Sequence, residues 1–107
     1  MLPKKYEPVI EECKRALQAL YRERFAGLVL YGSMARGDYD DESDIDLLVL
    51  LTGSVRSTSE IEAIDTALSG IQFECDRLIS AEAVSLDDYQ AGRWSFLRIA
   101  ANEGASV

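Results

Sequence analysis

Apolar residues recur every three to four positions from Glu7 to Phe25, which predicts an amphipathic helix. Pro8 falls in the first turn, where a helix tolerates proline. The polar side of this helix is expected to carry Lys14, Arg15, Arg22 and Glu23. The apolar side is expected to consist of Val9, Ile10, Cys13, Leu17, Leu20 and Tyr21.

Two apolar runs follow this helix and predict strands. Leu28–Tyr31 suits a short buried strand, and Asp44–Leu51 predicts a second strand that is apolar except for its two aspartates. Between them, Gly32-Ser33 ends the first strand. A single helical turn is expected at residues 34–36, followed by an acidic loop that continues to Ser43.

The second half of the chain predicts one more strand among helices. Residues 57–60 have capping-box spacing, so a helix is expected to begin there and to end at Gly70. Alternating apolar and polar residues predict a third strand at Ile71–Ile79. Two short helices, broken near Ala91-Gly92, are expected within Ser80–Gly104. This order predicts an α/β (α+β) protein with a small mixed β-sheet flanked by helices.

Composition narrows the possible functions. The 107 residues predict a single domain over residues 1–107. The absence of histidine excludes Ser-His-Asp and Cys-His catalysis and histidine-bound zinc. The net charge of −8, from 11 basic and 19 acidic residues, argues against direct binding to nucleic acid, which needs clustered Lys and Arg.

Cysteine usage and hydropathy predict a cytoplasmic protein that does not enter a membrane. Cys13 and Cys75 are far apart in sequence and form no paired motif, so both are expected to be reduced and buried. The N-terminal segment, residues 1–8, has no apolar run of the signal-peptide kind. The longest apolar stretch, Leu47–Leu51, is much shorter than the roughly 20 residues that span a bilayer.

The clearest candidate for chemistry is the pair Asp44 and Asp46. Residues i and i+2 of a strand point to the same face, so their Cα atoms should lie about 6–7 Å apart on one side of the sheet. Two carboxylates at that spacing repel each other, and Mg²⁺, which binds oxygen ligands together with substrate phosphates, relieves the repulsion. The alternative is a solvated acidic strand end.

The Gly32-Ser33 turn is a candidate phosphate-binding site. Backbone N–H groups where a strand turns into a helix attract anions, glycine allows close approach, and the Ser33 hydroxyl adds a donor. An ordinary turn is the alternative. A Walker-A loop is excluded because Asp38 and Tyr39 replace the required Lys and Ser/Thr, and an EF-hand is excluded by Ile45 and Leu51.

The two candidates together resemble a known family. Gly-Ser, ten further residues and Asp-x-Asp form a signature of the nucleotidyltransferase superfamily related to DNA polymerase β. The stretch Gly32-Ser33-Met34-Ala35-Arg36-Gly37 and the small size resemble the minimal nucleotidyltransferases. Many of these proteins are the antitoxins of HEPN/minimal-nucleotidyltransferase toxin–antitoxin pairs.

The resemblance implies a two-magnesium enzyme that uses ATP. Asp44 and Asp46 would bind both Mg²⁺ ions, and Gly32 and Ser33 would hold the ATP phosphates. A third carboxylate, which would bind one of the metal ions and accept the proton of the acceptor hydroxyl, is expected on a neighbouring strand. Asp76 is the best match, and Glu74 is its rival. The alternative without a catalytic role is a surface ion pair of Asp76 with an arginine, either Arg77 or Arg98.

Arg36 lies at the position of an arginine in the family motif, and two roles are open for it. Its guanidinium could contact a phosphate of the nucleotide. It could equally tie down the acidic loop through Asp38 or Asp44. A second arginine-containing segment, Arg93, Trp94 and Arg98, could form a partner-facing patch, although a packed tryptophan is the commoner outcome.

The resemblance further implies transfer of AMP from ATP to a tyrosine hydroxyl of a HEPN ribonuclease toxin, in a hetero-oligomer with that toxin. Two alternatives remain open: a non-catalytic antitoxin that neutralises the toxin by binding, and an enzyme that modifies a small-molecule hydroxyl. The chain does not resemble the toxin itself, whose Arg-x4-6-His motif needs a histidine.

Overall fold

The sheet contains four strands in the order β3-β2-β1-β4. In the computed structural model, which describes residues 4–107, β1 (Phe25–Tyr31) pairs antiparallel with β2 (Ile45–Leu51). β3 (Ile79–Ser85) runs parallel to β2, and the two-residue strand β4 (Ala105–Ser106) pairs antiparallel with β1. Residues 1–3, which belong to the segment expected not to be a signal peptide, lie outside the described residues.

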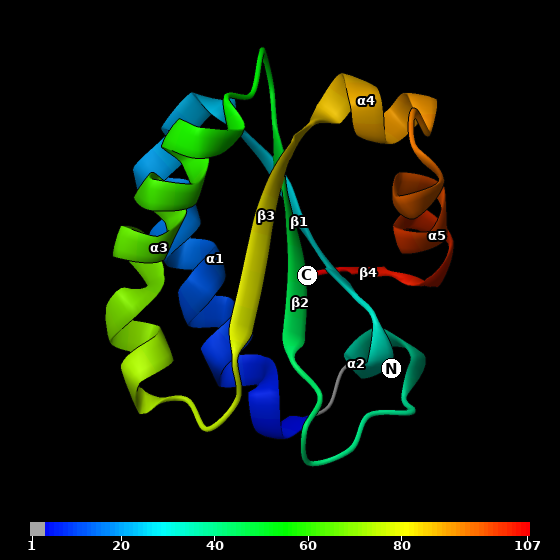
Figure 1. The fold of residues 1–107 in the computed structure, drawn as a ribbon. Coiled ribbons are helices and arrows are strands. Elements are labelled where there is room, and N and C mark those ends of the chain that lie inside the picture. The colour runs from blue at the N-terminus through cyan, green and yellow to red at the C-terminus, as the bar shows by residue number, and fades with distance from the viewer. Residues whose placement is uncertain (1–3) are drawn as a thin grey trace.

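Helices cover both faces of this sheet (Figure 1). On one face lie α1 (Glu7–Tyr21), which the 3₁₀ turns Lys4–Tyr6 and Arg22–Arg24 flank, and α3 (Ser57–Glu74). On the other face lie α4 (Leu86–Ala91) and α5 (Ser95–Glu103). The single turn α2 (Ser33–Arg36) follows β1 directly.

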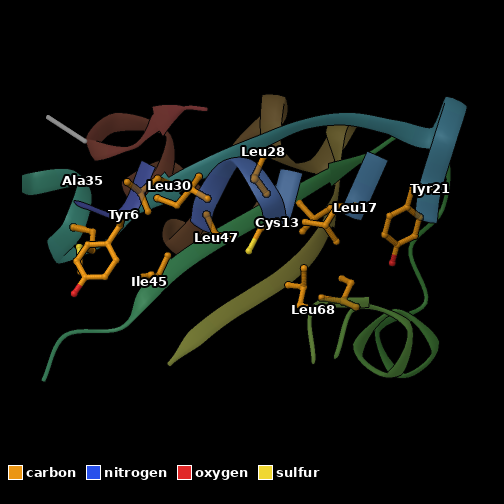
Figure 2. Close-up of a cluster of buried hydrophobic side chains, with 14 of the residues drawn as sticks. Tyr6, Cys13, Leu17, Tyr21, Leu28, Leu30, Ala35, Ile45, Leu47 and Leu68 are labelled. Atoms are coloured by element: carbon orange, nitrogen blue, oxygen red, sulfur yellow. The ribbon is translucent and has the colours of Figure 1, made fainter. Parts of the chain in front are cut away.

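The central strand β2 is buried on both faces, which explains its nearly continuous apolar sequence. Ile45, Leu47, Val49 and Leu51 pack with α1 and α3 in the larger core, part of which Figure 2 shows between Tyr6 and Tyr21. Leu48 and Leu50 pack on the opposite face with residues of α4 and α5. Asp46 lies two residues before Leu48 in the same strand, so both side chains point to the face of the sheet that α4 and α5 cover.

Most elements predicted from the sequence are confirmed. They include the first helix, both apolar strands, the turn at residues 34–36 and the two short C-terminal helices. The buried residues Ile10, Cys13, Leu17 and Tyr21 follow the predicted helical stripe, whereas Leu20 is 39% exposed. The expectation of an α/β protein with a small mixed sheet is correct.

The third predicted strand, Ile71–Ile79, is wrong. Helix α3 does not end at Gly70 but continues to Glu74, and the strand begins only at Ile79. Ile64, Leu68 and Ile71 keep a helical spacing and all pack against the larger core, so burial extends the helix past the glycine. The strand prediction assumed that the alternating apolar residues form one buried face. Phe73, the largest of them, is instead 90% exposed.

Within residues 4–107, no helix is both long enough and apolar enough to span a membrane. The two cysteines form no disulfide; Cys13 is buried, as expected, and Cys75 is half-buried. Burial raises the pKa of the Cys13 thiol to about 12, with a smaller contribution from Cys75. Cys13 therefore behaves as a small apolar core residue.

Candidate functional site

The aspartate pair lies where β2 begins. Asp44 immediately precedes the strand and Asp46 is its second residue, opposite Tyr31 of β1. Both side chains are half-buried. Burial and, to a smaller extent, the nearby charge of Asp44 raise the pKa of Asp46, so the structure brings these two predicted site residues together.

The Gly32 turn lies directly against Asp46. Gly32 has a φ of +76°, a conformation that side chains rarely allow, and a Cβ placed on it would lie 2.5 Å from Asp46 Oδ2. The Gly32 carbonyl accepts hydrogen bonds from the N–H groups of Ala35 and Arg36, both at 3.1 Å, which form the α2 turn. The predicted phosphate-binding turn and the predicted metal ligands are therefore neighbours.

Electrostatics at Asp46 favour a bound cation. Burial is the largest cause of its raised pKa, the nearby Asp44 carboxylate adds to the effect, and Arg36 opposes it. A folded state that holds a carboxylate with a raised pKa loses stability at neutral pH, where that group is charged. A divalent cation between Asp44 and Asp46 would remove this cost.

Arg36 makes ion pairs with two carboxylates. Its Nε donates to Asp38 Oδ2 at 3.2 Å, and its Nη1 donates to both carboxylate oxygens of Glu103, at 3.2 and 3.0 Å. These contacts raise the pKa of Arg36. Of the two sequence alternatives, the loop tie to Asp38 is present, and no ion pair with Asp44 occurs among the described residues. A contact with phosphate stays a prediction.

Asp76 does not lie on a strand. It lies in the loop between α3 and β3 and accepts a hydrogen bond from the Tyr6 hydroxyl at 3.4 Å. Lys5 Nζ lies 3.9 Å from its Oδ2. A hollow beside α1 is lined by Asp76 and by its rival Glu74, together with Tyr6, whereas Asp46 belongs to the opposite face of the sheet. The structure does not bring Asp76 or Glu74 to the aspartate pair.

Among the described residues, the structure also does not show the surface ion pair with Arg77 or Arg98 that was the alternative for Asp76. Its ion pair is with Lys5, and no ion pair with Arg77 or Arg98 occurs among residues 4–107. Arg77 instead binds the loop before β2, donating from Nη1 to the carbonyls of Asp40 and Ser43 at 2.6 and 2.7 Å. This structural role explains why a charged residue follows Asp76.

Glu82 is a carboxylate on the Asp46 face of the sheet that sequence analysis did not single out. It lies on β3, in the same alternating set as Ser80, and Ser80 pairs with Asp46. Burial, followed by the charges of Asp46 and Glu82, raises the pKa of the Tyr31 hydroxyl to about 12. The alternation of Ile79, Ala81 and Ala83 with polar residues was the signal that could have identified this strand and Glu82.

A groove of about 430 Å³ adjoins this carboxylate. It lies between β3, α4 and α5 and is lined by Glu82, Leu48, Val84, Trp94 and Phe96, among others. Trp94 is 50% exposed, and the Arg93 guanidinium lies 5.0 Å from its ring centroid. Trp94 is therefore not a fully packed core residue.

Two carboxylates suit a magnesium site that the substrate completes. Within the described part of the chain, no three Asp, Glu, Cys or His side chains gather closely enough to hold a metal ion. Mg²⁺ often binds through one or two carboxylates and takes its remaining ligands from water and substrate phosphates. Asp44 and Asp46, next to a glycine turn, fit that arrangement.

Comparison with known proteins identifies the family of this chain. Residues 10–101 match the nucleotidyltransferase domain family. The chain is 35% identical over 72 residues to "Putative protein adenylyltransferase MJ0141" of Methanocaldococcus jannaschii, covering 67% of this chain and 72% of the relative. It is 50% identical over 44 residues to "Putative protein adenylyltransferase MJ0604" of the same organism, covering 41% of this chain and 44% of that protein.

A solved structure supports the fold. The crystal structure of a "putative nucleotidyltransferase" from Sulfolobus solfataricus is similar with a TM-score of 0.54 and 17% sequence identity. The similarity covers 94% of this chain and 86% of that chain. The chain belongs to the nucleotidyltransferase domain family, and its activity is nucleotidyl transfer.

Proposed function

We propose that this nucleotidyltransferase transfers AMP from ATP to a tyrosine hydroxyl of a HEPN-type ribonuclease toxin and thereby acts as its cytoplasmic antitoxin. The observation that carries the proposal is the contact between the Gly32 turn and the Asp46 carboxylate, with Asp44 beside it. Phosphate-binding N–H groups next to paired carboxylates suit a nucleoside triphosphate with magnesium. The names of both Methanocaldococcus relatives support a protein acceptor.

In the proposed reaction, the acceptor oxygen attacks the α-phosphorus of ATP and forms a P–O bond to AMP. The bond from the α-phosphorus to the bridging oxygen breaks, and pyrophosphate leaves. Asp44 and Asp46 would hold magnesium, which would supply positive charge against the phosphates. The Ser33 hydroxyl would donate a hydrogen bond to a phosphate oxygen.

A carboxylate must accept the proton of the acceptor hydroxyl, because the chain has no histidine. The sequence-based proposal gave this role to Asp76. Glu82 is the stronger candidate, because it shares the sheet face of Asp46 and borders the groove near Trp94. The exposed tryptophan and the net charge of −8 suit a basic protein acceptor on this side.

The direct test uses ATP that carries a radioactive α-phosphate, Mg²⁺ and a purified HEPN-type ribonuclease toxin. We expect label on a toxin tyrosine with wild type and none with Asp46→Asn. Mass spectrometry of the toxin should then show one or more added adenylates. Labelling that is equal with Asp46→Asn would refute the metal-binding role.

The two alternatives give different results in the same assay. Neutralisation of the toxin by an Asp44→Ala/Asp46→Ala double variant would indicate inhibition by binding alone. Transfer of label to small-molecule hydroxyls, with none to the toxin, would indicate a different acceptor class.

A further inference from the structure

The Glu103 carboxylate binds the same turn that is proposed to hold phosphate. The N–H of Gly32 donates to Glu103 Oε1 at 3.1 Å, and the Arg36 guanidinium bonds both Glu103 oxygens. The Glu103 side chain is 18% exposed and that of Arg36 is 45% exposed, and the two bonds between them join opposite charges. One carboxylate thus fixes both the glycine and the arginine of the Gly-Ser-x-Ala-Arg segment.

The fold delivers Glu103 to this position through the junction of α5 and β4. Glu103 is the last residue of α5, and β4 then pairs Ala105 with Leu30 near the end of β1. Gly104 allows the close approach, since a Cβ there would lie 2.7 Å from Val29 Cγ1 and 3.0 Å from the Leu30 carbonyl. The C-terminal strand therefore anchors Glu103 beside Gly32.

The contacts leave specific donors free for a ligand. Asp38 and Glu103 hold two of the three Arg36 nitrogens, Nε and Nη1. Within residues 4–107, neither Arg36 Nη2 nor the Ser33 hydroxyl makes a hydrogen bond. Glu103 thus holds Arg36 beside the Gly32 turn.

We propose that Glu103 is a positioning residue for nucleotide binding, which holds the Gly32 turn and aims Arg36 at the phosphates of ATP. This inference rests on the proposed use of ATP at the Gly32-Ser33 turn. Glu103 itself contacts neither reacting group. Its removal should weaken nucleotide binding more than it slows the chemical step.

The test measures MgATP affinity and transfer kinetics for Glu103→Ala, Glu103→Gln and Glu103→Asp. The control, Glu62→Gln, makes the same neutralising change as Glu103→Gln at an exposed position on α3. For Glu103→Ala we expect a KM for ATP about tenfold higher, with kcat changed less than about threefold, because charge-assisted bonds are lost. Glu103→Asp should recover part of the affinity, and Glu62→Gln should match wild type.

Hydrogen exchange at the Gly32 amide gives a readout that needs no nucleotide. Exchange should be faster in Glu103→Ala than in wild type at equal global stability, and Glu103→Gln, which keeps an acceptor oxygen, should lie between them. ATP affinity in Glu103→Ala that equals or exceeds that of wild type would overturn the positioning role; tighter binding would show that Glu103 competes with phosphate. A wild type that binds no MgATP would instead overturn the proposed function itself.

Discussion

The Asp46 carboxylate occupies the space that a side chain on Gly32 would need. An ideal Cβ on Gly32 lies 2.5 Å from Asp46 Oδ2 and 3.4 Å from its Cγ. The close contact joins the turn that follows β1 to the start of β2. It makes the phosphate-binding and metal-binding parts of the proposed site a single structural unit.

Gly32→Ala should disrupt this unit. The new methyl group must displace the Asp46 carboxylate, and alanine is also strained at a φ of +76°. We expect transfer activity to fall at least about 100-fold and the free energy of unfolding to fall by about 1–3 kcal/mol. Labelled-ATP transfer and denaturant unfolding measure the two effects.

Gly37→Ala provides the matched control. Gly37 has a φ of +87°, but a Cβ there meets no atom within 4 Å. It should therefore show the backbone strain without the displacement of Asp46 and keep clearly more activity than Gly32→Ala. Equal losses in the two variants would show that strain alone, not contact with Asp46, explains the requirement for glycine.

Asp46→Asn should stabilise the fold while it abolishes activity. Burial and Asp44 raise the pKa of Asp46 in the folded state, so the charged form costs stability above that pKa. The amide removes this cost, and we expect the Tm at pH 7 to rise by a few degrees, as for a change of under about 1 kcal/mol. The gain should disappear below the unfolded pKa of about 3.9, where wild-type Asp46 is protonated in both states.

Thermal unfolding at pH 7 and pH 3.5, with and without Mg²⁺, tests this expectation. Mg²⁺ should raise the Tm of wild type, because a ligand that binds only the folded state stabilises it, and should have little effect on Asp46→Asn. A variant that is less stable than wild type at pH 7 would contradict the unfavourable charge at this position.

The sequence predicts the parts of the fold that local patterns specify. Leu47–Leu51 is apolar throughout because β2 is covered on both faces, and the buried stripe from Ile10 to Tyr21 is visible as a helical period. Ile71 shows the limit of this approach. Its neighbours alternate as in a strand, but it packs beside Leu68 in the core, and only tertiary burial decides between the two periods.

The part of the site that lies in one continuous segment was also predictable from the sequence. Gly32, Ser33, Asp44 and Asp46 lie in one continuous motif, and the structure brings the turn and the aspartates together. Glu103 could not be inferred, because it is 71 residues from Gly32 and reaches it only through the pairing of β4 with β1. Asp76 was favoured by a misplaced strand boundary, which only the register of β3 on β2 reveals.

Glu82→Gln and Asp76→Asn should separate the two candidates for the third carboxylate. If Glu82 accepts the proton of the acceptor, its amide should lower kcat by about 100-fold or more and leave the KM for ATP nearly unchanged. Asp76→Asn should keep nearly full kcat, because its carboxylate binds Tyr6 and Lys5 on the other side of the sheet. The reverse order of effects would restore the original assignment to Asp76.

Arg77 should matter for the site through the loop that precedes Asp44. Besides its bonds to the Asp40 and Ser43 carbonyls, its Nε donates to the Tyr6 hydroxyl at 2.6 Å. Lysine cannot reproduce these divergent hydrogen bonds, so Arg77→Lys should lower the free energy of unfolding by about 2 kcal/mol.

The same substitution should raise the Mg²⁺ concentration needed for half-maximal transfer, because a loosened loop no longer fixes Asp44. Arg93→Lys is the control, since Arg93 makes an exposed ion pair with Asp88 that should contribute less than about 1 kcal/mol. Equal effects of the two substitutions on stability and Mg²⁺ dependence would show that the contacts of Arg77 do not position Asp44. A selective effect of Arg77→Lys would show that the residue after Asp76 supports the metal site from the opposite side of the sheet.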